Sequence, residues 1–321
     1  MIRFAVIRIL QAIPLMAVVI LLVFFLLQLI PGDPVQAMVG QYPVPPEFRA
    51  SIESHYHLND PLPVRLLQYF ANLLHGDIGY SFQMQRPVLD LILERAPRTL
   101  LLAGAGFAIG IPVGIAIGTI SATTTHRSVD RFWTTTTLIA YAIPSFWLGQ
   151  LLVIVFAMHF GWFPTQGMAP LISRSSGFAW VLERARYLAL PATAYAIYEA
   201  TRAARLMRAS VVETLGQGYI ITAKAKGLSR RAIIWRHVLR NSSLPVVTVM
   251  GYAFGVAMGG AVLTETVFSW PGIGLLLIDA IRARDNQTIV GVVLFISFAV
   301  ILMNLIVDLL YSALDPRIRT L

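Results

Sequence analysis

The sequence predicts an all-α polytopic membrane protein with six transmembrane helices, and three observations carry this prediction. Of the 321 residues, 57% are hydrophobic and only 13% are charged, a balance far outside that of ordinary soluble domains. The apolar residues gather in segments of about 20 residues, the length of helix that crosses a hydrocarbon core about 30 Å thick. The Lys and Arg residues stand between these segments and favour one predicted side.

Six segments are expected to span the membrane. In chain order they are residues 9–30, 99–120, 133–160, 187–207, 244–268 and 289–310. The first is longer than the 7 to 15 or so apolar residues of a signal peptide, so we expect it to be a retained helix. The fourth is the weakest, because Arg202, Arg205 and Arg208 follow its apolar run. These arginines recur every three residues and therefore share one side of a helix, which can lie at the membrane surface.

The spans divide the chain into three regions. Residues 1–30 form an N-terminal transmembrane helix, residues 31–98 an extracytoplasmic loop region, and residues 99–321 a five-helix core with a cytoplasmic loop at 210–243. With the N-terminus inside, fifteen of the 25 Lys and Arg residues fall in inner segments and ten in outer ones. This asymmetry, together with the even number of spans, predicts that both termini are cytoplasmic.

Several function classes are excluded by what the sequence lacks. It has no cysteine, so neither a disulfide framework nor a thiolate metal site is possible. The net charge of +9 is spread between apolar spans rather than over a soluble basic face, so we expect no nucleic-acid partner. The only lysines, Lys224 and Lys226, each follow an alanine, so there is no P-loop, and neither HExxH nor GxSxG occurs. We therefore expect no catalytic, cofactor or metal site on this chain.

The stretch "YIITAKAKGLSRRAIIWRHVLRN", residues 219–241, combines six basic residues with an ordered helical pattern. Residues 214–225 predict one helical segment, and Gly227 ends it in the left-handed conformation. Ser229 can cap a second helix whose apolar side consists of Ile234, Trp235, Val238 and Leu239. Small residues around the glycine leave backbone exposed, so another protein can approach closely there. The alternative is a basic loop that only fixes the topology.

This stretch resembles the EAA loop of ABC importer permeases, in the form found in the dipeptide, oligopeptide and nickel branch. Four further motifs resemble the same branch and occur in the same order: "PGDP" after the first span, "AIPSFWLG" in the third, "ETVFSWPGIG" after the fifth and "DPRIR" near the C-terminus. Together they cover nearly the whole chain. The resemblance implies the type I ABC importer permease fold, with a helical corner that docks in a groove of an ATP-hydrolysing subunit.

The resemblance also implies which residues couple the chain to the ATPase. They are Tyr219, Thr222, Ala223, Lys224, Ala225, Lys226, Gly227 and Leu228, with Ala223 and Gly227 at the positions of closest approach. The sequence departs from the branch at Gly216 and Gly218, where arginine and an acidic residue are more usual. No substrate-binding residue follows from the motifs.

The implied function is a permease subunit in the bacterial inner membrane that passes short peptides delivered by an extracytoplasmic binding protein. Its expected partners are a homologous second permease, two ABC ATPase subunits that hold ATP and magnesium, and the lipid bilayer. Nickel complexes, glutathione and opine-like solutes stay open as cargo of the same branch. An ion-gradient-driven secondary transporter is the alternative from another class, and would need matching broken helices in two halves. An intramembrane enzyme would need paired carboxylates, and only Glu199 and Asp308 are acids at such depth.

Overall fold

The computed structural model describes residues 2–29, 33–39, 45–55, 57–170, 175–257, 259 and 262–314. The motif "DPRIR" and the first half of "PGDP" lie outside the described residues. The described chain forms two compact units. Unit 1 comprises Met1–Thr99, Met258–Val262 and Pro271–Leu321, and unit 2 comprises Leu100–Ala257 and Leu263–Trp270.

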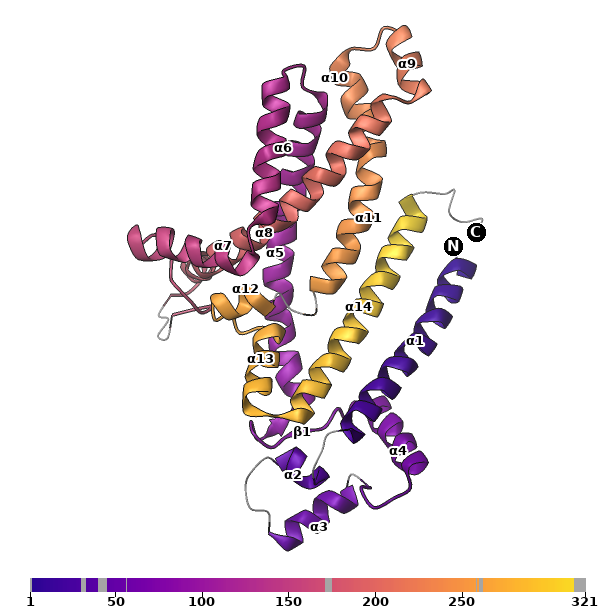
Figure 1. The fold of residues 1–321 in the computed structure, drawn as a ribbon, viewed down its shortest axis with the longest axis vertical. Coiled ribbons are helices and arrows are strands. Elements are labelled where there is room, and N and C mark those ends of the chain that lie inside the picture. Colours follow the sequence, from indigo (N-terminus) through magenta and orange to yellow (C-terminus); the bar gives the residue numbers. More distant parts are fainter. Residues whose placement is uncertain are drawn as a thin grey trace. The chain divides into compact units, whose positions relative to one another are not determined.

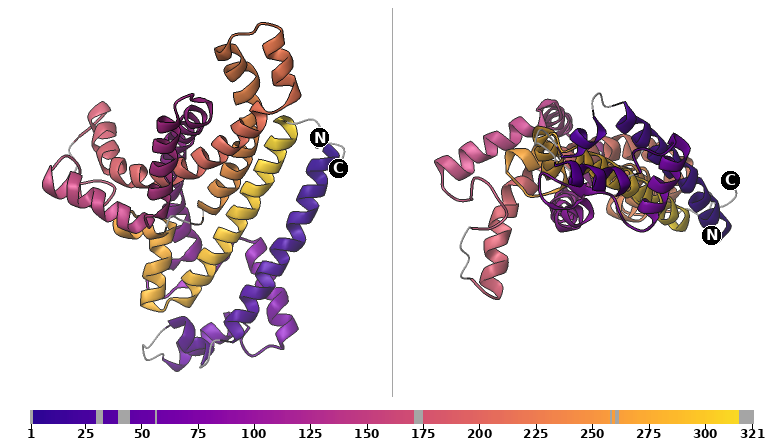
Figure 2. Two further views of the ribbon diagram at one scale, coloured as in Figure 1. Left: turned by 45° about the horizontal axis from the view of Figure 1, so that its top comes forward. Right: turned by 90° about the horizontal axis from the view of Figure 1, so that it is seen from below.

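Unit 1 is built on two antiparallel helices, α1 (Ile2–Gln28) and α14 (Asn286–Leu314), which run alongside each other in Figures 1 and 2. Ile20 and Val23 of α1 pack with Leu294 of α14. Near the start of α1, Arg8 Nε lies 3.3 Å from Asp308 Oδ2 of α14. The beginning of the first helix and the end of the last therefore lie at the same end of unit 1, as an even number of spans requires.

The region between α1 and the next long helix contains short elements. They are α2 (Pro34–Val39), α3 (Pro46–His55), α4 (Leu62–Leu74) and the antiparallel strands β1 (Tyr80–Ser81) and β2 (Arg86–Pro87). Arg49 donates hydrogen bonds of 2.7 and 3.0 Å to Asp33 and holds the pKa of that carboxyl below its usual value. Tyr69 packs in the cluster with α1, and burial raises its pKa to about 12.

A buried carboxylate joins β1 to α14. Asp285 follows α13 (Ile273–Ala283), is 1% exposed, and precedes the first residue of α14. Its Oδ2 accepts hydrogen bonds from Ser81 Oγ (2.5 Å) and Thr288 Oγ1 (2.7 Å), and its Oδ1 accepts one from Thr288 N (3.1 Å). Asp285 therefore acts as an N-cap that satisfies the first turn of α14 while fixing a strand 204 residues away in sequence.

Unit 2 contains the other helices. They are the second part of α5 (Val88–Thr123), α6 (Arg127–Ala142), α7 (Ser145–Leu152), the π-helix η1 (Val153–His159), α8 (Phe178–Leu215), α9 (Gly218–Ala225), α10 (Arg230–Ile233), the π-helix η2 (Ile234–Val238), α11 (Leu239–Ala257) and α12 (Val262–Val267). Within this unit α9 and α10 lie together at the end where α6 and α11 begin (Figure 1).

Small residues let α5 and α8 approach to backbone contact. Glycines stand every fourth residue on the α5 side of this contact, at Gly106, Gly110, Gly114 and Gly118, and a Cβ on any of them would clash with α8. At Gly114 the added carbon would lie 2.5 Å from Ala200 O and 2.6 Å from Ala203 Cβ. Such small-residue repeats are typical of helix pairs in membranes, where close packing replaces the hydrophobic effect as the driving force.

Within the described residues, three helices are long and apolar enough to cross a membrane: Val6–Gln28, Val88–Thr123 and Asn286–Leu309. The pair Arg127–Ala142 and Ser145–His159 qualifies together but is bent by 98°. The predicted third span is therefore broken, because Ile143 is extended and Pro144 cannot continue the helix. The count of six spans stays a prediction, since α8 is long but carries charges and α11 ends at Ala257, short of residue 268.

Candidate functional site

The candidate site is the corner formed by residues 216–241, which joins α8 to α11. The predicted helical segment 214–225 is wrong at its start, because Thr214 and Leu215 belong to α8. Gly216 caps α8, Gln217 has an extended backbone (φ −75°, ψ 145°), and α9 begins at Gly218. Gly216 and Gly218, which differ from the residues usual in the importer branch, therefore lie on either side of a break between α8 and α9.

The end of α9 has the geometry expected from its sequence. Gly227 has φ +74°, in the left-handed region. Its N–H donates to Lys224 O (2.9 Å), and the N–H of Leu228 donates to Ala223 O (3.3 Å). These two hydrogen bonds form a Schellman motif, which satisfies carbonyls that the helix end leaves free. A Cβ on Gly227 would meet no heavy atom within 4 Å. Glycine is therefore favoured here by the left-handed backbone conformation and not by a lack of space.

Ser229 caps α10 as predicted, since its Oγ accepts a hydrogen bond from Ala232 N at 3.3 Å. The predicted apolar side is wrong at Trp235, which is 64% exposed, while Ile233 and Val238 are buried. The reason is that residues 234–238 form the π-helix η2. Its i→i+5 hydrogen bonds bring residues five apart onto one side, whereas the prediction assumed α-helical spacing.

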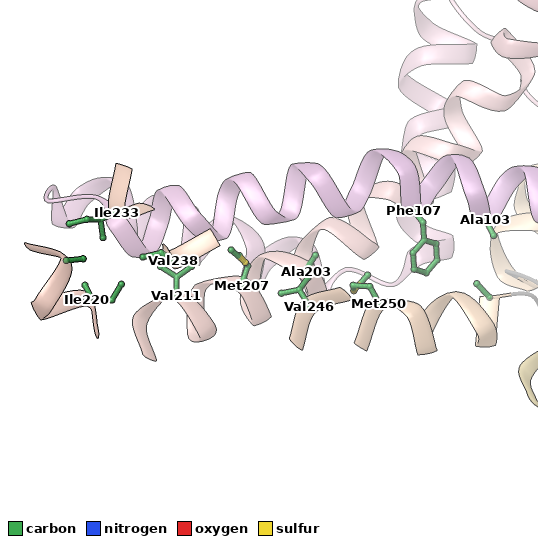
Figure 3. Close-up of a cluster of buried hydrophobic side chains, with 12 residues drawn as sticks. Ala103, Phe107, Ala203, Met207, Val211, Ile220, Ile233, Val238, Val246 and Met250 are labelled. Atoms are coloured by element: carbon green, nitrogen blue, oxygen red, sulfur yellow. The ribbon is translucent and has the colours of Figure 1, made fainter. Parts of the chain in front are cut away.

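The corner is fastened to the helices on either side of it. Figure 3 shows Ile220, Ile233, Val238 and Val211 converging at one end of a buried cluster that continues along α5, α8 and α11. Polar contacts add to this packing: Asn241 Nδ2 donates to Tyr219 Oη (2.9 Å), and Ser242 Oγ donates to Thr214 Oγ1 (2.8 Å). Arg230 donates to the carbonyl of Thr123 at the end of α5. A displacement of the corner is therefore transmitted to α5, α8 and α11.

Seven of the eight predicted coupling residues are exposed: Tyr219, Thr222, Lys224, Ala225, Lys226, Gly227 and Leu228. Ala223 is only 5% exposed and packs in the cluster of Figure 3. Its small side chain thus lets α9 lie close to the chain's own core. The eight residues lie together in α9 and the turn that follows it.

Two features of the corner surface were missed from the sequence. Ile221 and Trp235 are each 64% exposed, so apolar side chains stand on the outside among six basic residues. A cavity of about 490 Å³ lies between the end of α5 and the corner, lined among others by Thr123, Lys224 and Arg230. The segment 216–241 contains no acidic residue. An apolar and basic surface of this kind is suited to a protein partner with a complementary acidic rim.

The two acids expected at membrane depth each face an arginine. Arg202 Nη1 lies 3.3 Å from Glu199 Oε2 within unit 2, and Arg8 pairs with Asp308 within unit 1. Among the described residues, no group of three His, Cys, Asp or Glu side chains is arranged to hold a metal ion.

Comparisons with known proteins give one consistent result. The sequence pattern of the family described as "Binding-protein-dependent transport system inner membrane component" matches residues 110–320, and that of its N-terminal region matches residues 1–103. A putative peptide transport system permease protein of Brucella abortus is 40% identical over 312 residues, 97% of each chain. The di/tripeptide transport system permease protein DppB of Pseudomonas aeruginosa is 38% identical over 315 residues, 94% of each chain.

One solved structure shows the likeness in fold. The MetNI methionine ABC transporter in inward-facing conformations matches with a TM-score of 0.53 and 16% identity, over 70% of this chain and 96% of that chain. The corner, α8, α11 and the end of α5 from residue 110 lie within the part matched by the first family pattern.

Proposed function

Because the chain belongs to the family of binding-protein-dependent transport system inner membrane components, we propose that it forms one half of the passage for short peptides in an ATP-driven importer. The peptide cargo is supported by relatives with 40% and 38% identity over nearly the full length, which are named peptide permeases. The expected partners are a homologous second permease, two ATPase subunits carrying ATP and magnesium, and an extracytoplasmic binding protein.

The observation that carries the proposal is the exposed, basic, glycine-ended corner at residues 216–241. Its side toward the chain is packed and hydrogen-bonded, whereas its other side presents Tyr219, Lys224, Lys226 and Leu228 to solvent. A loop that only fixed topology would need the charges but not a Schellman motif, a capped second helix and a buried cluster. We assign the exposed side to the contact with an ATPase subunit.

The corner then converts nucleotide binding into movement of the membrane helices. ATP binding draws the two ATPase subunits together and carries the docked corners with them. Because the corner is joined to α5, α8 and α11, these helices shift between inward-open and outward-open arrangements. ATP drives this change only by binding more tightly to one of the two states. The sidedness follows the same assignment, with the corner and both termini in the cytoplasm.

The test is a double charge reversal on the corner, Lys224→Glu with Lys226→Glu. The whole complex is reconstituted in liposomes with its binding protein, and uptake of a dipeptide is measured with ATP inside and without an ion gradient. We expect the reversal to lower ATP-driven uptake and recovery of the ATPase during purification at least about tenfold, because two attractive contacts become repulsive.

The matched control is Arg127→Glu, an exposed basic residue at the first turn of α6 outside the corner. Uptake by this variant is expected to match the unmodified chain. Equal activity of the doubly reversed and control chains would refute docking at the corner. Uptake that needs an ion gradient and no ATP would refute the importer itself.

A further inference from the structure

Two contacts fix the register between α6 and α8, which run antiparallel within unit 2 (Figure 1). At one level Arg208 Nε and Nη2 each donate to Asp130, both at 2.9 Å. At the other level the rings of Tyr141 and Tyr198 stack with centroids 6.0 Å apart and planes 12° from parallel. Eleven residues of α6 and ten of α8 separate the two levels, which is about 15 Å of helix.

This register gives the depth of the tyrosine pair. Asp130 lies in the first turn of α6, directly after the turn that follows α5, which the proposed topology places at the cytoplasmic surface. A point about 15 Å further along the helix lies halfway through a hydrocarbon core about 30 Å thick. The tyrosine pair also stands just before the 98° break between α6 and α7. Broken helices near the bilayer midplane are typical places for substrate sites in transporters.

Between these two levels, one positive charge among the described residues is not neutralised. Arg202 pairs with Glu199, which is 2% exposed, at 3.3 Å. Arg205 is exposed, and its Cζ lies 4.8 Å from the centroid of the Tyr141 ring. Within the part of the chain that the structure describes, no carboxylate pairs with Arg205. Tyr141, Tyr198 and Arg205 thus form an open site with one available cation, here called the tyrosine–arginine site.

The exposed charge of Arg205 indicates contact with water rather than lipid. Arg205 borders a cavity of about 260 Å³ with a mainly apolar lining, which includes Ile117, Trp133 and Leu138, and with hydroxyl groups from Ser121, Thr134 and Thr137 at its edge. An unpaired guanidinium in hydrocarbon is strongly unfavourable, and intramembrane charges almost always face a bundle interior or a water-filled space. The polar side of α6 and α8 therefore belongs to the passage.

We propose that the tyrosine–arginine site binds the C-terminal carboxylate of the peptide within the membrane, between the cytoplasmic surface and the midplane, an inference that rests on the proposed function. The Arg205 guanidinium matches a carboxylate in charge and hydrogen-bonding geometry. The stacked rings of Tyr141 and Tyr198 lie under the guanidinium groups of Arg205 and Arg202, at 4.8 and 5.9 Å, and so restrict where the Arg205 cation can lie. The peptide's amino group has no equivalent partner here, because Glu199 is buried against Arg202. A single exposed cation holds the peptide weakly enough for it to leave again.

The experiment uses the absence of cysteine in the chain. Tyr141→Cys is introduced, the full complex is purified in detergent, and the rate of reaction with a membrane-impermeant methanethiosulfonate reagent is measured. About 10 mM dialanine should slow the reaction about tenfold if the site has a Kd near 1 mM, whereas dialaninamide, which lacks the carboxylate, should not. Adding Arg205→Gln should abolish the protection by dialanine.

Ile139→Cys is the control, on another side of α6 at nearly the same depth and 58% exposed. Its reaction rate should not respond to dialanine. The inference is overturned if Tyr141→Cys does not react, which would mean that lipid or the second permease covers the site. It is also overturned if dialanine and its amide protect equally or if neither protects. Uptake by the unmodified complex is measured in parallel. Normal ATP-driven uptake, together with no protection of Tyr141→Cys by dialanine, would refute only the proposed site. Absence of ATP-driven uptake would refute the proposed function.

Discussion

The left-handed turn at Gly227 allows a graded test of whether the corner couples ATP hydrolysis to transport. An added Cβ meets nothing within 4 Å, so a substitution there costs only backbone strain at φ +74°. That strain is about 1–2 kcal/mol for an ordinary L-residue, which corresponds to about a 5- to 30-fold fall in the population of the native turn. Asparagine tolerates this conformation best, and a β-branched residue tolerates it least.

We therefore expect the series Gly227→Asn, Gly227→Ala and Gly227→Val to lower the number of peptides moved per ATP hydrolysed in that order. The valine variant should lose up to about 30-fold, while its amount in the membrane stays unchanged because the corner lies outside the spans. The assay is peptide uptake and phosphate release measured in the same proteoliposomes.

The matched control is Gly218→Ala, also in the corner and also without neighbours around an added Cβ, but with an ordinary helical backbone. It should keep the full coupling ratio. If Gly218→Ala and Gly227→Val behaved alike, or if Gly227→Asn were as poor as Gly227→Val, backbone strain at the turn would not be the cause and the reasoning would be refuted.

Three further predictions concern contacts elsewhere in the chain. Gly114→Ala should destabilise the α5–α8 contact and reduce the folded complex in membranes, while Gly104→Ala, which meets no atom within 4 Å, should leave its yield unchanged in size-exclusion chromatography. Asp285→Ala should lower the unfolding free energy by about 1–3 kcal/mol, since it removes a buried cap and leaves Ser81 without its acceptor, and thermal unfolding should show less loss for Asp285→Asn. The hydrogen bond from Arg49 lowers the pKa of Asp33, so the pair stabilises the region between α1 and α5 above the ordinary carboxyl pKa of about 4 and loses this contribution as the pH falls through the lowered value. Asp33→Asn should remove that acid-dependent component from thermal unfolding curves.

Features that depend on neighbouring residues were predictable from the sequence. The helix-ending conformation of Gly227 and the cap at Ser229 each require a few adjacent residues, and both were confirmed. The apolar length of the segments likewise predicted the helices that form α1, α5 and α14. These signals are local, so no knowledge of the rest of the fold was needed.

Features that depend on helix geometry or on distant residues were not predictable. Trp235 was misplaced because nothing in the sequence marks the π-helix that rotates it outward. The bend after Ala142 follows from Pro144, but prolines also occur inside long helices here, as Pro191 does in α8. The pairing of Asp130 with Arg208, 78 residues apart, sets the register of α6 and α8 and leaves no trace in either segment alone.

The length of α8 has a consequence for how force travels. The part of α8 that follows Pro191, residues 192–215, makes an uninterrupted helix of about 36 Å, a little more than the thickness of the hydrocarbon core. One end of this helix meets the corner, and the same helix carries Tyr198 and Arg205. Under the proposed function, a tilt of the corner would therefore move the tyrosine–arginine site with no flexible joint between them. Rigid-body motion of one helix would then be enough to link the two places, without a series of side-chain rearrangements between them.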